Sequence, residues 1–288
     1  MNITGKTRVF FVLANPVAQV RAPELFNHVF ARFGVNATLV PVQVPADCLV
    51  NFVRSSLASP NVGGLLLSIP YKGAVLDLLD ECDTAGRIAG AVNAVRRAAD
   101  GRLQGALFDG VGFMGCLAQY GIACRDKRVL IIGAGGAASA IAVALAEGGA
   151  AEVAHFDPVP GKAAALANRL ASFGISQARA AMSSDAEGYE LIINASPLGL
   201  DSSDAMPVCV EHIQQGAAVV DILMKNQPTP LVRRARERGL TAVPGFEMLI
   251  QQTPAYLDFF GYADAADELR RDATTLRRVI YPQALLAA

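Results

Sequence analysis

The sequence predicts an α/β protein with two domains. Its 288 residues would fill two domains of ~150 residues each. Short apolar runs alternate with helical patterns along most of the chain, which favours mostly parallel sheets covered by helices on both faces. Hydrophobic residues make up 52% of the chain and charged residues 18%, so large cores are expected and disorder is not.

The first hundred residues repeat an order of apolar run, break and helical pattern. Strands are expected at Arg8–Ala14, Ala37–Val44 and Val62–Ile69, and helices at Pro23–Phe33, from Ala46 to about Leu57, and from near Tyr71. Two further runs, Ala91–Val95 and Arg102–Ala106, flank Asp100-Gly101, which is a hairpin turn signal. A helix is expected at about Asp109–Tyr120.

A second α/β series begins at Arg128. Its strand candidates are Arg128–Ile132, Ala151–Asp157, Leu191–Ala195, Ala217–Ile222 and the weaker Leu240–Val243. After Pro244 the chain reads as helical almost to its end. We therefore place a first domain at residues 1–105 and a second at 106–243, and we expect the helices of residues 244–288 to pack back on the first.

Charge and composition argue against several classes of protein. The 25 basic and 26 acidic side chains leave a net charge of −1, which disfavours a nucleic-acid or membrane-surface binder. The uncharged run Val129–Ala146 is interrupted by glycines, so we expect strand, turn and helix there and no membrane span. Five cysteines without a C-x-x-C pair indicate reduced thiols and a cytoplasmic protein, and the scattered His28, His155 and His212 indicate no metal site.

The strongest single motif is a glycine turn between a strand and a helix. The apolar strand ending at Ile132 runs into Gly133-Ala134-Gly135-Gly136-Ala137-Ala138. In a dinucleotide-binding turn the first glycine permits the tight bend, and the second lets the backbone approach a pyrophosphate. Ala138 stands where a third glycine is common and is small enough for close packing. The motif predicts a Rossmann-type, doubly wound cofactor domain, with Gly133 to Ala137 at the phosphates.

The choice of dinucleotide is expected to depend on Asp157. This residue ends the second strand of the series, where a carboxylate accepts hydrogen bonds from the adenosine ribose. A carboxylate there would repel a 2′-phosphate, and no arginine follows closely, so NAD is favoured over NADP. The alternative is that Asp157 only caps the next helix.

Six short motifs occur in one order along almost the whole chain. They are Gly64–Lys72, Ala91-Val92-Asn93, Gly105–Phe113, the glycine turn, Asn194–Gly199 and Gly245–Gln252. Together they resemble the shikimate/quinate dehydrogenase family. The resemblance implies a two-domain enzyme that transfers hydride reversibly between a ring alcohol and a nicotinamide, with substrate in a cleft between the domains. It also implies cofactor contacts at Asn194, Ser196 and Gly245, and a small cyclic alcohol or ketone as partner of a monomer or homodimer.

Lys72 and Asp109 match the family's catalytic lysine and its partner aspartate. By themselves they would be a solvated lysine and a helix N-cap. Oxidising a secondary alcohol requires removal of the hydroxyl proton as the hydride leaves, and a lysine held in a cleft can accept it. A neighbouring carboxylate orients the ammonium. Its effect on the lysine pKa opposes that of desolvation, and the sequence does not decide between them.

The substrate positions are only partly kept. Asn93 and Gln252 match substrate contacts, and Ser68 replaces the family threonine with another hydroxyl. Val20 and Ala22 stand where the family has two serines that bind the substrate carboxylate. The remaining departures are Leu66 for asparagine, Leu107-Phe108 for Asn-Thr, and Met224 for tyrosine; Arg21 is expected to point away.

Loss of two hydrogen bonds to a carboxylate would cost roughly 3–6 kcal/mol, or about two to four decades of affinity. We therefore expect a family member with a changed substrate that is less charged or more apolar. Two alternatives remain: a nucleotide-binding sensor without turnover, and a folate-type dehydrogenase of similar two-domain plan.

Overall fold

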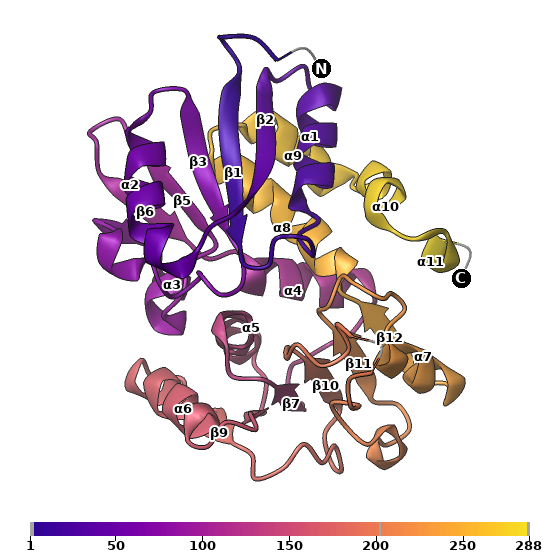
Figure 1. The fold of residues 1–288 in the computed structure, drawn as a ribbon. Coiled ribbons are helices and arrows are strands. Elements are labelled where there is room, and N and C mark those ends of the chain that lie inside the picture. The colour runs from indigo at the N-terminus through magenta and orange to yellow at the C-terminus, as the bar shows by residue number, and fades with distance from the viewer. Residues whose placement is uncertain (1–2, 202, 287–288) are drawn as a thin grey trace. The chain divides into compact units, whose positions relative to one another are not determined.

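The computed structural model describes residues 3–201 and 203–286, and it divides into two compact units (Figure 1). Unit 1 comprises Met1–Phe108 and Leu249–Ile280, and unit 2 comprises Asp109–Met248 and Tyr281–Ala288. Residues 106–108 thus belong to unit 1, and residues 244–248 and 281–288 to unit 2. Each unit is built on its own sheet, and the expected α/β class is confirmed.

Unit 1 contains a mixed six-stranded sheet of order β2-β1-β3-β5-β6-β4. Its strands are β1 (Arg8–Ala14), β2 (Ala37–Gln43), β3 (Val62–Leu67), β4 (Glu81–Cys82), β5 (Ala94–Arg97) and β6 (Leu103–Ala106). Its helices are α1 (Ala22–Arg32), α2 (Leu49–Ala58), α3 (Thr84–Ala89), most of α8 (Phe246–Phe259), α9 (Ala263–Arg271) and α10 (Thr274–Ile280), with short 3-10 turns at Ala46–Cys48 and Leu76–Leu78. β1 pairs in parallel with both β2 and β3.

Alternation along β1 divides the core of unit 1 between two helix layers. Leu13 packs on one face with Val53 of α2, while Phe10 lies on the other. The Phe10 ring lies 5.7 Å from that of Phe30 on α1 and 4.9 Å from that of Phe260, just after α8. The sheet is therefore covered by helices on both faces (Figure 1). The carboxyl end of β3 leads into the loop that carries Ser68 and Lys72.

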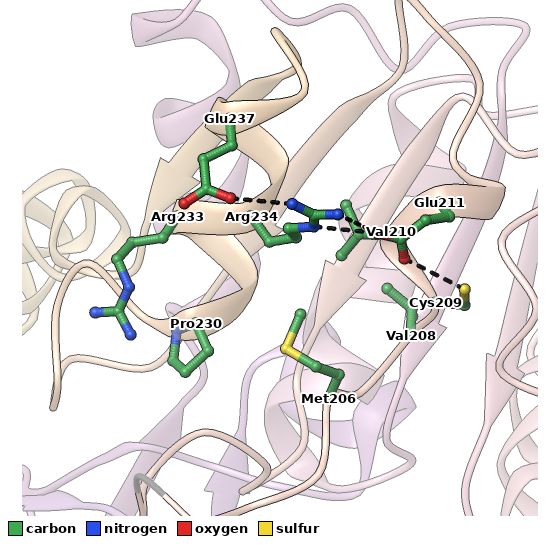
Figure 2. A pocket seen from close by; sticks show the side chains of 9 residues that line it. All are labelled: Met206, Val208, Cys209, Val210, Glu211, Pro230, Arg233, Arg234 and Glu237. Carbon is green, nitrogen blue, oxygen red and sulfur yellow. Dashed lines mark hydrogen bonds and ion pairs between the residues drawn. The ribbon is translucent and has the colours of Figure 1, made fainter.

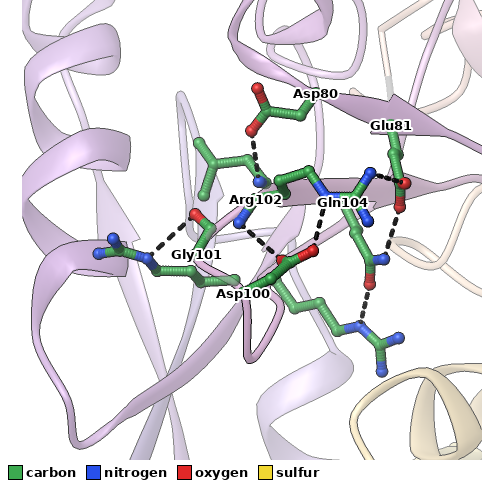
Figure 3. Close-up of polar contacts among 9 residues, drawn as sticks. Asp80, Glu81, Asp100, Gly101, Arg102 and Gln104 are labelled. Carbon is green, nitrogen blue, oxygen red and sulfur yellow. Dashed lines mark hydrogen bonds and ion pairs between the residues drawn. The ribbon is translucent and has the colours of Figure 1, made fainter.

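The predicted hairpin is present as β5 and β6, which pair antiparallel. Gly101 takes a φ of +91°, which an L side chain rarely adopts. Arg102 contacts both Asp100 and Glu81, and Glu81 also accepts a hydrogen bond from Gln104 (Figure 3). These contacts hold β6 beside β4, with which it pairs in parallel. β6 ends at Ala106, three residues before Asp109.

Unit 2 contains a six-stranded parallel sheet of order β12-β11-β10-β7-β8-β9. Its strands are β7 (Arg128–Ile132), β8 (Glu152–Phe156), β9 (Ala178–Ala180), β10 (Leu191–Asn194), β11 (Ala218–Asp221) and β12 (Thr241–Pro244). Its helices are α4 (Asp109–Gln119), α5 (Gly136–Glu147), α6 (Lys162–Ser172), α7 (Pro230–Glu237) and α11 (Gln283–Leu286), with a 3-10 turn at Val210–His212. From β7 the chain adds β8 and β9 on one side and then β10, β11 and β12 on the other. The strand order therefore reverses between β7 and β10, and ligands are expected outside the carboxyl ends of these two strands.

The predicted doubly wound order is confirmed, and most differences are at edges. The helix expected from near Tyr71 is wrong: this segment forms turns and the 3-10 turn at Leu76–Leu78, and the next helix, α3, begins at Thr84. Gly73 lowers the helix propensity of the segment. β4 and β9 have two and three residues and were not predicted, because so short an element carries too little alternation to distinguish it from a loop. β5 begins at Ala94, three residues after the expected start at Ala91. None of the helices in the described part of the chain has the length and apolar character needed to cross a bilayer.

Candidate active site

Within unit 1 the loop after β3 and the start of β5 are joined by backbone hydrogen bonds. The Leu67 amide donates to the Asn93 carbonyl (2.8 Å), and the Val92 amide donates to the Lys72 carbonyl (2.7 Å). Ser68 and Lys72 are half-buried and Asn93 is 1% exposed. The structure therefore brings the predicted Ser68, Lys72 and Asn93 together at the carboxyl end of β3.

Gln252 of α8 joins this group through Asn93. The Asn93 Nδ2 donates to Oε1 of Gln252 (3.3 Å), and Oδ1 of Asn93 accepts the amide of Phe108 (3.0 Å). The Tyr256 hydroxyl contacts the Asn93 carbonyl at 3.4 Å. Asn93 therefore orients Gln252, whose Nε2 donates to no described residue and can serve a substrate oxygen.

The loop that carries Val20 and Ala22 begins beside the Lys72 loop, because the Asn15 amide donates to the Ile69 carbonyl (3.0 Å). Val20 is half-buried, and Ala22 is 7% exposed at the start of α1. Arg21 between them donates to Glu24 through both Nε (2.8 Å) and Nη2 (2.5 Å). The guanidinium is thus held against Glu24, and its Nη2 also donates to the Ile280 carbonyl (3.3 Å).

Asp109 is the first residue of α4 in unit 2, and its side chain is 3% exposed. The next residue, Gly110, has no room for a side chain, because a Cβ there would lie 2.8 Å from the carbonyl oxygen of Ala140 on α5. The close approach of α4 and α5 thus holds the start of α4 firmly. Lys72 and Asp109 belong to different units, and their joint action remains a proposal.

The glycine turn of unit 2 has the features of a phosphate cradle. Gly133 has a φ of +114°, and a Cβ there would lie 2.7 Å from the Ala195 carbonyl oxygen at the end of β10. Gly135 is the N-cap of α5, no side chain caps that helix end, and a Cβ at Gly135 would meet nothing within 4 Å. The open space and the uncapped amides fit a dinucleotide pyrophosphate. Ala138 is fully buried, as its place in the motif predicts.

Asp157, just after β8, is tied into the turn. Its Oδ2 accepts the Ala134 amide (3.0 Å) and lies 3.1 Å from the Lys162 Nζ, and its Oδ1 accepts the Val159 amide (3.0 Å). The alternative that Asp157 caps the next helix is wrong, because Gly161 is the N-cap of α6 and no side chain caps that helix end. The contact of Asp157 with a ribose stays a prediction. The Lys162 ammonium compensates the negative charge of Asp157, on which the preference for NAD depended.

Asn194 and Ser196 form a buried network at the end of β10. The Asn194 Oδ1 accepts the Ser196 amide and hydroxyl, and its Nδ2 donates to the Asp221 Oδ1 (3.1 Å). Asp221 ends β11 and also accepts the Thr229 hydroxyl (2.7 Å). The side chains of Asn194 and Ser196 are thus engaged in hydrogen bonds within the protein. Gly245 packs closely on the segment after β11, because a Cβ at this position would lie 2.4 Å from the Ile222 carbonyl oxygen.

Burial raises the pKa of Asp221 from 3.8 to about 6, although Thr229, the Leu223 amide and Asn194 lower it. The folded chain then holds this proton more tightly than the unfolded chain. The contribution of Asp221 to the free energy of unfolding is therefore fully present below pH 4 and is lost as the pH rises through 6. We expect the free energy of unfolding of the unaltered chain to fall by about 3 kcal/mol across this window relative to Asp221→Asn. Urea unfolding of both proteins between pH 3 and 7.5 measures it, and parallel pH profiles would contradict the assignment.

A buried acid that was overlooked lies between Gly245 and Gln252. Glu247 is fully buried in unit 2 and accepts the Tyr281 hydroxyl (3.0 Å). Burial, with the charge of Glu247, raises the pKa of both Tyr281 and Cys116, the latter to about 12. A glutamate in the first turn of a helix usually faces solvent, and its partner is 34 residues away, so local pattern could not reveal the pair.

Two cavities lie away from these residues. One, of about 530 Å³, lies between the turn at Val210 and α7, where Arg234 contacts Glu211 and Glu237 (Figure 2). The other, of about 870 Å³, lies in unit 1 beside Cys82, whose pKa burial and Asp83 raise to about 11. Neither includes a predicted site residue, and in the described residues no group of three or more His, Cys, Asp or Glu side chains could hold a metal.

Comparison with known proteins supplies the family. Residues 12–95 match the family described as the shikimate dehydrogenase substrate binding domain. The chain is 37% identical over 254 residues to a shikimate dehydrogenase (NADP(+)) of Rubrobacter xylanophilus, covering 87% of this chain and 89% of that protein.

Two solved structures extend the likeness. Shikimate 5-dehydrogenase of Listeria monocytogenes, in complex with shikimate and NAD, has a TM-score of 0.81 and 26% identity, covering 94% of this chain and 98% of that one. The 5-ketofructose reductase of a Gluconobacter species has a TM-score of 0.79 and 29% identity, covering 93% and 99%. The preference for NAD is unsupported, since the Rubrobacter relative is named for NADP(+). On these likenesses and the motifs that carry them, the chain belongs to the shikimate dehydrogenase family of NAD(P)-dependent oxidoreductases that act on CH–OH groups.

Proposed function

We propose that this dehydrogenase interconverts a secondary alcohol and a ketone on a compact polyhydroxylated substrate that carries no carboxylate. One observation carries the proposal. The Lys72 loop keeps its polar groups, while the neighbouring loop presents Val20 and Ala22 and its only cation, Arg21, is held by Glu24. A carboxylate placed there would lose water and gain no charged partner from that loop, which is unfavourable.

Lys72 and Asp109 are proposed to handle the proton. A nicotinamide dinucleotide held at its phosphates by the Gly133–Ala137 turn would supply the hydride chemistry at the carbinol carbon. In the oxidative direction the hydroxyl proton passes to the neutral Lys72 amine as the C–H bond breaks, and in reduction the ammonium returns it to the ketone oxygen. The Asp109 carboxylate is proposed to accept a hydrogen bond from a substrate hydroxyl and so to orient it. Gln252 and Ser68 supply the remaining hydrogen bonds to hydroxyl groups.

The relatives support a change of substrate within this family. The Gluconobacter relative is named for reducing 5-ketofructose, an uncharged sugar, and it is about as similar to this chain as the shikimate enzyme of Listeria. A fold that serves both substrates needs only a change in the groups that meet the carboxylate. Val20, Ala22 and Leu66 are changes of that kind.

A screen of ketones with NADPH and NADH tests the proposal. The set contains 5-ketofructose, the ketones formed by oxidising shikimate and quinate, and uncharged cyclic ketones, and consumption of reduced nicotinamide is followed by absorbance. We expect turnover of at least one uncharged ketone. Binding of the dinucleotide without turnover of any member would favour a sensor and contradict the proposal.

We propose NADP(H) as the preferred cofactor. The Asp157 carboxylate already accepts two backbone amides and is paired with Lys162, so it leaves less negative charge to repel a 2′-phosphate. The half-exposed Lys162 ammonium can instead bind that phosphate. The name of the Rubrobacter relative is in line with this choice.

Replacing Lys162 with alanine is expected to lower kcat/KM for NADP about 10-fold and to leave that for NAD within about threefold, because one exposed charge-assisted contact is lost. Asp157→Asn keeps an acceptor for the Ala134 amide and is expected to raise the preference for NADP further. Lys127→Ala, before the start of β7 at the other end of the strand, is the matched control. Equal losses with both dinucleotides would contradict the role of Lys162.

A further inference from the structure

Three successive residues at the end of β8 hold the glycine turn of unit 2. The Gly133 amide donates to the Phe156 carbonyl (2.7 Å), and the Ala134 amide donates to the Asp157 carboxylate (3.0 Å). The third contact joins the His155 Nδ1 to the Gly133 carbonyl oxygen at 3.4 Å. The turn is thus fixed by the neighbouring strand before any ligand arrives.

Two of these contacts act on one peptide group. The carbonyl of Gly133 and the amide of Ala134 belong to the same planar unit, so His155 holds its oxygen and Asp157 holds its hydrogen. A glycine at φ +114° offers little resistance to rotation of the peptide that follows it. Contacts at both ends remove that freedom and set the direction in which the next amides, of Gly135 and Gly136, point.

His155 is otherwise an unfavourable residue for its position. It is fully buried, and its Nε2 has no hydrogen-bond partner in the described structure. Along β8 it alternates with Ala154 and Phe156, which pack against Leu130 and Ile132 on the opposite face. A buried nitrogen without a partner is destabilising, and an apolar side chain of the same size would avoid that cost.

The imidazole of His155 has one polar contact, to the Gly133 carbonyl oxygen, and this contact determines which ring nitrogen carries the proton. A carbonyl oxygen only accepts, so Nδ1 carries the proton that it donates to Gly133, and Nε2 is the bare nitrogen. Burial lowers the pKa of His155 to about 4, so the ring is neutral near pH 7 and adds no charge beneath the phosphate site. The contact with Gly133 is therefore the property that an apolar residue would not supply.

We propose that His155 is a positioning residue for the cofactor: its Nδ1–H fixes the Gly133–Ala134 peptide so that the amides of the turn are directed at the dinucleotide pyrophosphate. This inference rests on the dinucleotide site of the proposed function. The proposal predicts opposite effects of this side chain on two quantities. Its Nδ1–H increases the affinity for the cofactor, while its buried Nε2 without a partner lowers the stability of the fold.

Two substitutions separate the two properties. In His155→Asn the amide Nδ2 is bonded to Cγ, as the imidazole Nδ1 is, so an N–H donor is kept at nearly the same place. The smaller side chain leaves a cavity. His155→Leu fills nearly the same volume and has no donor. We expect His155→Leu to raise the Kd for NADPH about 3- to 10-fold, the range of one neutral hydrogen bond, while His155→Asn stays within about twofold of the unaltered chain.

The stabilities are expected in the reverse order, with His155→Asn melting below His155→Leu because of its cavity. Val153→Ala, buried on the same face of β8 and remote from the turn, is the control for lost packing and should leave the Kd unchanged. Titration calorimetry gives the Kd, and scanning calorimetry gives Tm. The kcat at saturating cofactor should not change in any variant.

A Kd that follows Tm across the three variants, or that is unchanged in His155→Leu, would overturn the positioning role while leaving the proposed function intact. If the unaltered chain binds neither NADPH nor NADH, the proposed function fails, and this inference fails with it.

Discussion

Replacing Lys72 with methionine is expected to lower kcat about 10²- to 10⁴-fold, because the substitution removes the group that exchanges a proton with the reacting oxygen. Methionine keeps much of the length and apolar stem of lysine, so the backbone bond from the Val92 amide to residue 72 should persist. The Kd for NADPH should stay within about twofold, since no cofactor group is assigned to this side chain. Stopped-flow turnover and titration calorimetry on the same preparation measure the two quantities.

The matched control is Lys6→Met, an exposed lysine in the same unit that precedes β1. It should retain full activity. A Lys72→Met enzyme that keeps kcat within about threefold would exclude a proton-transfer role for this residue. If both kcat and cofactor binding collapse together, Lys72 serves the cofactor and not the substrate.

Introducing the two hydroxyls that the family has at this place is expected to create recognition of a carboxylate. In the double variant Val20→Ser, Ala22→Ser, kcat/KM for shikimate should rise about 10²- to 10⁴-fold, because each hydrogen bond to a charged group contributes roughly 1.5–3 kcal/mol. The gain should fall mainly on KM, since both hydroxyls act on binding.

Ala18→Ser lies in the same loop, is exposed, and adds a hydroxyl at a position with no assigned contact. It should leave shikimate turnover unchanged. If the double variant gains no more than this control, the poor fit for a carboxylate does not originate at Val20 and Ala22. The further substitution Leu66→Asn would then be the next position to restore.

Much of the fold could be predicted because local and tertiary signals agree. The strands Arg8–Ala14 and Arg128–Ile132 have the expected bounds, since each is a short apolar run ended by a residue that leaves the sheet. The hairpin at Asp100-Gly101 was predicted because its turn chemistry is local. The short edge strands β4 and β9 depend on neighbours far along the chain, and no pattern within two or three residues could show them.

The site was predicted where a motif is contiguous and overlooked where contacts are distant. The Gly133–Ala138 turn combines strand, bend and helix in one stretch, so its geometry follows from the sequence. Asp157 was assigned to a ribose on position alone, and its pairing with Lys162 becomes visible only when α6 folds back. The interactions of His155 and Asp221 likewise depend on burial and on partners that the strands bring together.

The most direct test of the account is a comparison of two ketones with the unaltered chain and NADPH. One is 5-ketofructose, and the other is the ketone formed by oxidising shikimate, which differs in carrying a carboxylate. We predict that kcat/KM for the uncharged ketone is at least about 10-fold the higher of the two. A kcat/KM near ~10⁵ M⁻¹s⁻¹ or above for the carboxylated ketone, with little turnover of the other, would contradict the claim that Val20 and Ala22 have changed the substrate.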